Sequence, residues 1–149
     1  MPNPIATRPT AARSAATQSY FEDVEIGVLL ETPGMTITEA HVGLFAGLVG
    51  ERSADPFAVP DLLPLCLSSG LGWRTDTPPL VVLAFMGFEW RSHAPVRVGD
   101  TIRARSHTAA KRAMKEGGVI FEEREIVNHR GDVVQSCRIT LLVARRPAA

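Results

Sequence analysis

The chain has 149 residues, enough for one domain with one core, and its 16 basic residues balance its 16 acidic ones. This balance argues against nucleic acid or an anionic membrane surface as a partner, and no apolar run approaches the roughly 20 residues of a membrane span. Two widely separated cysteines, Cys66 and Cys137, argue against a disulfide framework or a structural zinc site, so we expect a cytoplasmic protein.

The first 18 residues differ in composition from the rest of the chain. They are rich in Ala, Thr and Pro, and they contain no acidic residue and no run of large apolar residues. A signal peptide is therefore not indicated. An organelle transit peptide is one interpretation of this acid-free start, and a disordered tail is the interpretation that we favour. We predict a tail over residues 1–18 and a single domain over residues 19–147.

The first predicted helix begins at Thr38, a good N-cap, and ends near Gly50. Residues 20–30 before it predict an entry turn and a short strand. Apolar residues recur within the helix at helical spacing, namely Val42, Phe45, Ala46 and Val49. Residues 51–59 after it predict a loop, because serine, aspartate and proline are turn formers.

A second helix is predicted from Asp61 to about Trp73, with Pro64 tolerated in its first turn. It is apolar on nearly all sides, so we expect it to be buried. The remaining residues predict strands with a basic turn at 111–118 and a hairpin turn at 128–132; the strands are 80–90, 101–109, 119–127 and 133–144. The fold class that follows is α+β, with a curved, mostly antiparallel sheet wrapped around a buried helix.

Four segments, taken in this order, resemble the MaoC-like dehydratases and R-specific enoyl-CoA hydratases of the hotdog fold. They read TxTEAxxxLFAGLxG at 36–50, VPDLLPLCLSSGL at 59–71, FMGFEWRSHAPVRVGDTIR at 85–103 and xNxRGxVVxxxxxTLLVxRRP at 127–147. The resemblance implies an acyl thioester substrate on coenzyme A or an acyl carrier protein. It also implies a homodimer, or a hetero-oligomer with another hotdog chain, whose sheets pair edge to edge.

The catalytic segment departs from the family pattern. The family has an aspartate after the glycine that closes FAGLxG and a histidine a few residues later, whereas this chain has Glu51 at the first position and Pro56 at the second. The loop before the second helix is short, and the part that would bear the histidine is missing. Asp61 stands where the family often has the glycine that opens the helix.

Three carboxylates, Glu51, Asp55 and Asp61, are therefore the candidate catalytic groups, since two carboxylates in different environments can divide acid and base roles. The alternative interpretation gives the same three residues no catalytic role: Asp55 shapes a turn, Asp61 caps the helix and Glu51 is solvated. A capping Asp61 would also place negative charge where a thioester oxygen should bind. The resemblance implies further contacts with the acyl group from Val59, Pro60, Leu62, Gly87, Arg91 and His93.

Other residues have simpler expected roles. We expect His41, His107 and His129 to lie on the surface and Cys66 to pack in the core. The basic turn at 111–118 is expected to be a solvated hairpin tip, with attraction of coenzyme A phosphates as the alternative.

Two functions remain open. The first is a hydratase- or dehydratase-type enzyme on an acyl thioester with altered chemistry, such as an isomerisation or a cyclisation. The second is a non-catalytic hotdog subunit, or an acyl-ligand-binding protein, that partners an active MaoC-like chain. A thioesterase, with Asp61 activating water, is a third possibility. We expect no cofactor and no metal.

Overall fold

The structure is a computed structural model that describes residues 17–148. The tail predicted over residues 1–18 therefore lies outside the described residues, apart from its last two. None of the helices in the described part of the chain has the length and apolar character needed to cross a membrane.

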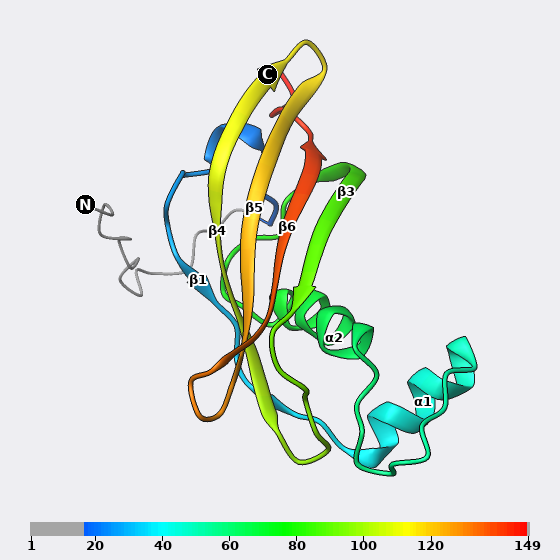
Figure 1. Cartoon of the computed structure of the whole chain (residues 1–149). Coiled ribbons are helices and arrows are strands. Elements are labelled where there is room, and N and C mark those ends of the chain that lie inside the picture. Colours follow the sequence, from blue (N-terminus) through cyan, green and yellow to red (C-terminus); the bar gives the residue numbers. More distant parts are fainter. Residues whose placement is uncertain (1–16, 149) are drawn as a thin grey trace.

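One antiparallel sheet of six strands forms the body of the molecule, and it curves around a helix (Figure 1). The strands follow the order β1-β4-β5-β6-β3, and β2 also pairs with β4. Their bounds are Leu30–Glu31 (β1), Met35–Thr36 (β2), Val82–Ser92 (β3), Thr101–Met114 (β4), Gly117–Asn128 (β5) and Val133–Val143 (β6). The predicted α+β class with a curved sheet is confirmed.

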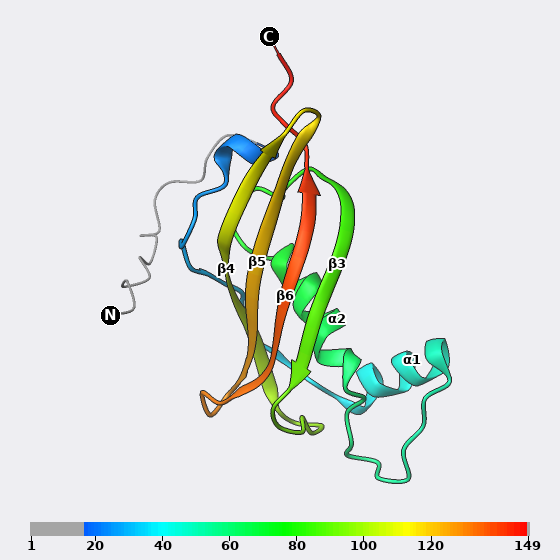
Figure 2. The ribbon, with the colours of Figure 1, turned by 45° about the horizontal axis from the view of Figure 1, so that its top comes forward.

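The first helix, α1 (Glu39–Val49), has the ends that the sequence predicts. At its start, the amide of Thr38 donates to Nδ1 of His41 at 3.0 Å, so His41 caps the helix. At its end, Gly50 adopts φ 76°, a left-handed conformation that glycine adopts without steric cost. No residue of α1 is buried, and the helix projects from the body beside α2 (Figure 2).

The second helix, α2 (Leu62–Gly72), lies in the hollow of the sheet and packs against β4 and β5. The side chains on its inner side are buried, namely Leu63, Pro64, Ser68 and Leu71. The opposite side is exposed along its length and carries Leu62, Cys66, Ser69 and Trp73. The predictions that the whole helix is buried and that Cys66 is a core residue are therefore wrong. One curved sheet covers only one side of a helix, and the sequence of α2 contains no polar stripe that marks the other side.

The core consists of two apolar clusters at the two ends of the sheet's inner face. The larger surrounds the start of α2 and is built on Ile37, Val59, Leu63, Val96, Ile102, Ile126 and Val134. The smaller contains Phe21, from the 3-10 helix η1 (Phe21–Asp23), with Ile120 and Val143. A Cβ at Gly118 would lie 2.0 Å from the Phe21 ring, so only glycine lets this aromatic side chain close the end of the sheet.

The hairpin between β4 and β5 is longer than the sequence indicates. β4 continues to Met114, and the turn that was expected over residues 111–118 is confined to Lys115 and Glu116. Lys111 lies inside the strand, where its ammonium group donates to the carbonyl oxygen of Val24 at 2.6 Å and lies 5.0 Å from the centre of the Phe21 ring. The prediction of a solvated tip is therefore wrong for Lys111, which attaches the N-terminal segment to the sheet.

Candidate functional site

A pocket of about 610 Å³ lies between α1, the loop that follows it and the start of α2. Five of the predicted site residues line it together, namely Glu51, Asp55, Val59, Pro60 and Asp61. Leu62 is the next residue along the chain and is 45% exposed. The three candidate carboxylates thus share one pocket, although they come from both ends of the loop.

Asp55 is held by the protein's own donors. The amide of Phe57 donates to its Oδ1 at 2.9 Å, and the guanidinium of Arg97 donates to its Oδ2 at 2.7 Å. These two hydrogen bonds, the amide of Phe57 first, hold the pKa of Asp55 below its ordinary value. Both of its oxygens are engaged, so Asp55 is suited to shaping the loop rather than to moving a proton.

The second half of the loop is fixed to the turn between β3 and β4. Ala58 forms a backbone bridge with Arg97, and the amide of Val98 donates to the carbonyl oxygen of Phe57 at 3.0 Å. That turn is itself closed by Asp100, which is buried and accepts the amide of Arg97 at 2.9 Å. Glu51, at the other end of the loop, has no such attachment within the described chain.

Glu51 and Asp61 are the two carboxylates of the pocket that remain available. Both are exposed, and neither side chain hydrogen-bonds to another part of residues 17–148. The backbone at Asp61 is nevertheless fixed, because the buried side chain of Gln135 donates to its carbonyl oxygen at 2.6 Å. Asp61 precedes α2 without capping it, since its side chain makes no cap hydrogen bond.

Two backbone N–H groups at the start of α2 are also available. A helix leaves its first four N–H groups without partners inside the helix. Here the amide of Leu63 donates to the carbonyl oxygen of Pro60 at 3.0 Å, and Pro64 has no N–H to donate. The amides of Asp61 and Leu62 have no acceptor within the described chain. Asp61 lines the pocket, and Leu62 follows it in the chain. These amides are the donors that the start of α2 offers to a carbonyl oxygen of a ligand.

None of the four histidines lines this pocket in the described structure. His41 caps α1, and His129 accepts the amide of Thr101 at 3.3 Å. His93 lies 2.7 Å from the hydroxyl of Ser136 through its Nε2. The remaining histidine, His107, is 3.6 Å from the carboxylate of Glu123.

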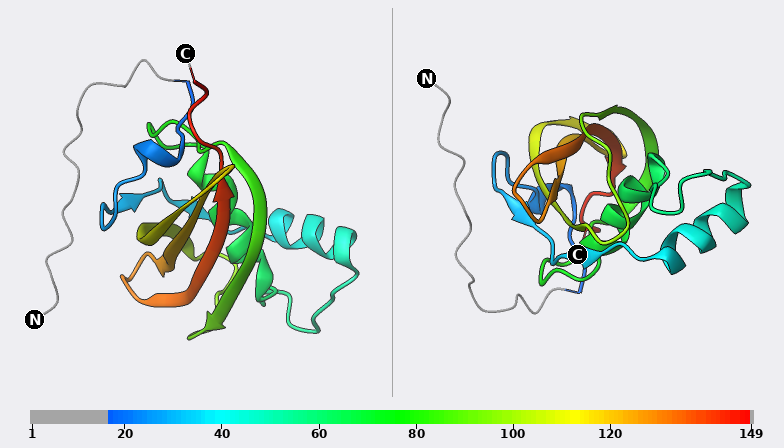
Figure 3. Two further views of the ribbon diagram at one scale, coloured as in Figure 1. Left: turned by 90° about the horizontal axis from the view of Figure 1, so that it is seen from above. Right: turned by 60° about the horizontal axis from the view of Figure 1, so that its bottom comes forward.

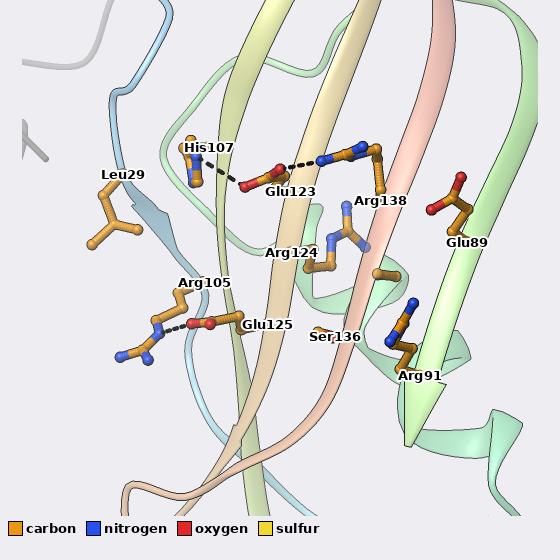
Figure 4. A pocket seen from close by; sticks show the side chains of 11 residues that line it. Leu29, Glu89, Arg91, Arg105, His107, Glu123, Arg124, Glu125, Ser136 and Arg138 are labelled. Atoms are coloured by element: carbon orange, nitrogen blue, oxygen red, sulfur yellow. Dashed lines mark hydrogen bonds and ion pairs between the residues drawn. The ribbon is translucent and has the colours of Figure 1, made fainter. Parts of the chain in front are cut away.

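The structure also places Gly87 and Arg91 away from the pocket. Gly87 lies on β3 opposite Thr140. Arg91 borders a broad hollow of about 740 Å³ on the face of the sheet opposite α2 (Figure 4). Strand alternation explains the position of Arg91, because it lies opposite Ser136 while its neighbour Trp90 lies opposite the buried Cys137.

Charged side chains of alternating sign cross this outer face from strand to strand. In one row, Glu123 accepts from Arg138 at 2.8 Å and lies beside His107, and in the next row Arg105 donates to Glu125 at 2.7 Å (Figure 4). These charges are largely satisfied by one another, as expected of a solvated sheet face. In the described part of the chain, no group of three or more His, Cys, Asp or Glu side chains is placed to hold a metal ion.

The sequence interpretation missed two features. One is Arg97, which fixes Asp55 but lies 42 residues away and carries no local signal. The other is the ion pair of Glu122 and Arg124, whose side chains face the inside of the sheet. The second had a signal, because residues 122–125 are four consecutive charged residues in one strand, and alternation sends two of them inward.

No protein-family model matches the chain, and no curated protein matches it. Solved structures do. A monoamine oxidase regulatory protein from Archaeoglobus fulgidus matches with a TM-score of 0.80 and 26% identity, over 89% of this chain and 99% of that one. A MaoC-like dehydratase from Rhodospirillum rubrum matches at 0.73 and 20%, over 87% of this chain and 99% of that one. An R-hydratase from Pseudomonas aeruginosa matches at 0.72 and 18%, over 85% and 86%.

The sheet, the helix in its hollow and these matches define a hotdog protein. Within that class, the solved structures that resemble the chain include MaoC-like dehydratases and R-hydratases, and the predicted resemblance is confirmed at this level.

Proposed function

We propose that this chain is a hydratase-type protein that acts on an acyl thioester carried by coenzyme A or an acyl carrier protein. We propose further that the reaction it catalyses differs from hydration. The observation that carries the proposal is the pocket at the start of α2. The pocket is lined by the unattached carboxylates of Glu51 and Asp61, and the available amides of Asp61 and Leu62 lie at its edge in the chain. The thioester carbonyl would accept from the amides, with Val59, Pro60 and Leu62 beside the acyl group.

The chemistry that best suits this set is a proton transfer by a single base. Hydration needs one group that activates water and another that delivers a proton to the α-carbon. Asp55 is engaged by Arg97 and Phe57, and no histidine lines the pocket of the described chain. Asp61 is unattached as well, but its carboxylate belongs to the turn whose amides would hold the carbonyl oxygen, so the proposal gives it no proton to move. A shift of the double bond needs only one base, because the carboxylate of Glu51 removes a proton from one carbon and returns it to another. The amides would stabilise the enolate oxygen meanwhile.

The negative charge of Asp61 opposes this role of the amides. It lies at the same turn, where it repels a developing oxyanion. The proposal therefore assigns Asp61 to the wall of the pocket and expects a slow reaction.

The proposal is tested with enoyl-CoA thioesters in D₂O. Deuterium entering the acyl chain, measured by mass spectrometry, reports proton transfer, and loss of the enone absorbance of crotonyl-CoA reports hydration. We expect deuterium entry that Glu51→Gln reduces at least a hundredfold. Glu39→Gln, on the exposed first turn of α1, is the matched control and should exchange normally. If Glu51→Gln exchanges at the rate of the unaltered chain, Glu51 is not the base.

A second candidate is a subunit that pairs with another hotdog chain, catalytic or not. It is favoured by the exposed apolar side chains of β3, an edge strand with no partner strand on its outer side among the described residues. They are Val82, Leu83, Phe85, Met86 and Phe88, each between 44% and 60% exposed. Edge strands of this length and character favour pairing with another chain. We propose a dimer, with a second copy or with a related chain.

Catalytic activity and molecular mass in solution together distinguish the enzyme from the subunit role. An inactive chain that purifies together with a second hotdog chain supports the subunit role. An active homodimer, with a mass near twice 16.1 kDa by light scattering, supports the enzyme.

A further inference from the structure

The side chain of Gln135 lies at the start of α2, among apolar side chains. It is 1% exposed, and Gln135 pairs across the sheet with Ile126, a member of the larger apolar cluster. A polar group buried in such a place needs hydrogen-bond partners, because leaving one unsatisfied costs about 1–3 kcal/mol. The two partners of Gln135 connect the edge strand β3 to the start of α2.

These partners fix which way the side-chain amide of Gln135 faces. The indole N–H of Trp90, which can only donate, donates to Oε1 at 3.3 Å. Nε2 donates to the carbonyl oxygen of Asp61 at 2.6 Å, and this oxygen can only accept. Reversing the amide would bring donor against donor at Trp90 and acceptor against acceptor at Asp61. Gln135 therefore holds the Asp61 carbonyl in one orientation, from inside the fold.

The contact with the Asp61 carbonyl also sets the direction of the Leu62 N–H. The peptide bond between Asp61 and Leu62 is trans and planar, so this C=O and this N–H point in opposite directions. The C=O is directed toward the buried Gln135, and the N–H is directed away from it. The Leu62 N–H has no acceptor within residues 17–148. It is thus an available donor on a rigid unit whose other end is fixed.

The same contact strengthens the Leu62 N–H as a donor. Hydrogen bonds in a chain polarise one another, by roughly 10–30% per bond. The indole of Trp90, the amide of Gln135 and the Leu62 peptide form such a chain, in which each N–H points onward to the next C=O. A stronger donor at Leu62 opposes in part the repulsion that the Asp61 carboxylate exerts on a developing oxyanion.

We propose that Gln135 is a positioning residue of the thioester site: it orients and polarises the peptide whose N–H, that of Leu62, donates to the thioester carbonyl oxygen. This inference rests on the proposed function. The alternative is that Gln135 only fills the core and satisfies Trp90. A side chain that only fills the core affects all ligands of the pocket alike, whereas a positioning side chain affects the ligand that has the carbonyl.

The test compares two ligands that differ by one oxygen. Butyryl-CoA has the thioester carbonyl, and S-butyl-CoA, a thioether, lacks it. Calorimetric titration of the whole chain gives the ratio of their affinities, which measures the contribution of the carbonyl contact. We expect a ratio of about tenfold for the unaltered chain, the worth of a good hydrogen bond.

Two variants of neighbouring residues on β6 are compared with the unaltered chain. Gln135→Met keeps the length of the side chain and removes both hydrogen bonds, and it should lower the affinity ratio about fivefold or more. Ser136→Ala is the matched control. The side chain of Ser136 lies on the outer face of the sheet, so this variant should leave the ratio unchanged.

A further variant separates positioning from packing at the same residue. In Gln135→Glu the protonated carboxyl keeps both contacts, since its C=O accepts from Trp90 and its O–H donates to Asp61. The ionised carboxylate cannot donate, and burial raises the pKa of a carboxyl. We expect the affinity ratio of Gln135→Glu to equal that of the unaltered chain at about pH 5 and that of Gln135→Met at about pH 8. The unaltered chain at both pH values controls for titration of Glu51 and Asp61.

The free chain is tested separately by ¹⁵N relaxation. We expect a Leu62 amide order parameter of about 0.85, as in rigid backbone, and a fall to below about 0.7 in Gln135→Met. An unchanged order parameter, equal losses of affinity for both ligands in Gln135→Met, or a ratio for Gln135→Glu that does not change with pH would overturn the role of Gln135. Equal affinity of the unaltered chain for the two ligands would instead refute the proposed function, and the order parameter would still decide whether Gln135 orients the peptide.

Discussion

The rest of the described chain covers one edge of the sheet and leaves the other edge open. The outer edge of β4 is covered, because β1 pairs with it at Leu30 and Glu31 and β2 pairs with it at Met35 and Thr36. The outer edge of β3 has no such cover in the described structure. The two views of Figure 3 show the same contrast, with the N-terminal strands against β4 and, among the described residues, β6 on one side of β3 and no strand on its other side.

The contrast divides the molecule into a covered half and an open half. The covered half includes β4, β5 and the inner side of α2. The open half includes β3, the outer side of α2 and α1, on which Leu44 and Leu48 are 71% and 86% exposed. Exposed apolar surface of this extent is typical of protein–protein contact sites, in agreement with the dimer proposed above. The pocket that holds Glu51 lies in the open half, so a partner bound there would lie near it.

The two sides of α2 give the largest expected effect. Leu71 is 1% exposed and Leu62 is 45% exposed on the same helix. Replacing a buried leucine by alanine leaves a cavity and typically costs about 2–5 kcal/mol. We expect Leu71→Ala to lower the free energy of unfolding by this amount and Leu62→Ala to lower it by less than about 1 kcal/mol. Urea unfolding of the two variants measures both, and equal losses would mean that a partner covers Leu62 as fully as the sheet covers Leu71.

The open edge gives the second effect. Phe85 on β3 is 60% exposed, and an aspartate in its place would put an unpaired charge into any interface formed there. We expect Phe85→Asp to weaken self-association or pairing at least tenfold, which is about 1.4 kcal/mol.

Arg103→Asp on β4 is the matched control, since the side chain of Arg103 is 48% exposed and its edge is already covered. Sedimentation velocity over a range of protein concentrations measures the association constant of each variant. An unchanged association constant for Phe85→Asp would remove β3 from the interface.

The smallest expected effect concerns the loop that borders the pocket. The pKa of Asp55 is lower in the folded chain than its ordinary value, so its contacts stabilise the fold above the unfolded pKa, near 3.8, and are lost as pH falls through the folded value. We expect Asp55→Asn to be slightly less stable than the unaltered chain at pH 7, and this difference to vanish in acid. Thermal unfolding at pH 7 and at a series of pH values from about 4 down to about 2 measures the difference. A difference that persists in acid would contradict the role given to the Arg97 contact.

The sequence predicts the local elements of this fold well. Thr38 and Gly50 mark the ends of α1, because capping depends on neighbouring residues alone. The bounds of α2 and the hairpin at 128–132 follow from similarly local signals.

What the sequence did not predict depends on contacts across the fold. The extent of β4 through Lys111 depends on carbonyl oxygens of the N-terminal segment, about 90 residues earlier. The exposure of Cys66 depends on which side of α2 the sheet covers. The candidate site was also predicted only in part. Glu51, Asp55 and Asp61 lie close in sequence, and their shared pocket was predicted. The hydrogen bond from Arg97, which distinguishes Asp55 from the other two carboxylates, was missed.

The central claim is that the start of α2 receives an acyl thioester, and NMR titration of the unaltered chain with butyryl-CoA tests it most directly. The account predicts saturable shifts that are largest for the amides of Asp61 and Leu62 and extend to Glu51. Shifts confined to the outer face around Arg91 and Arg138, or no saturable shift within residues 50–62, would contradict it.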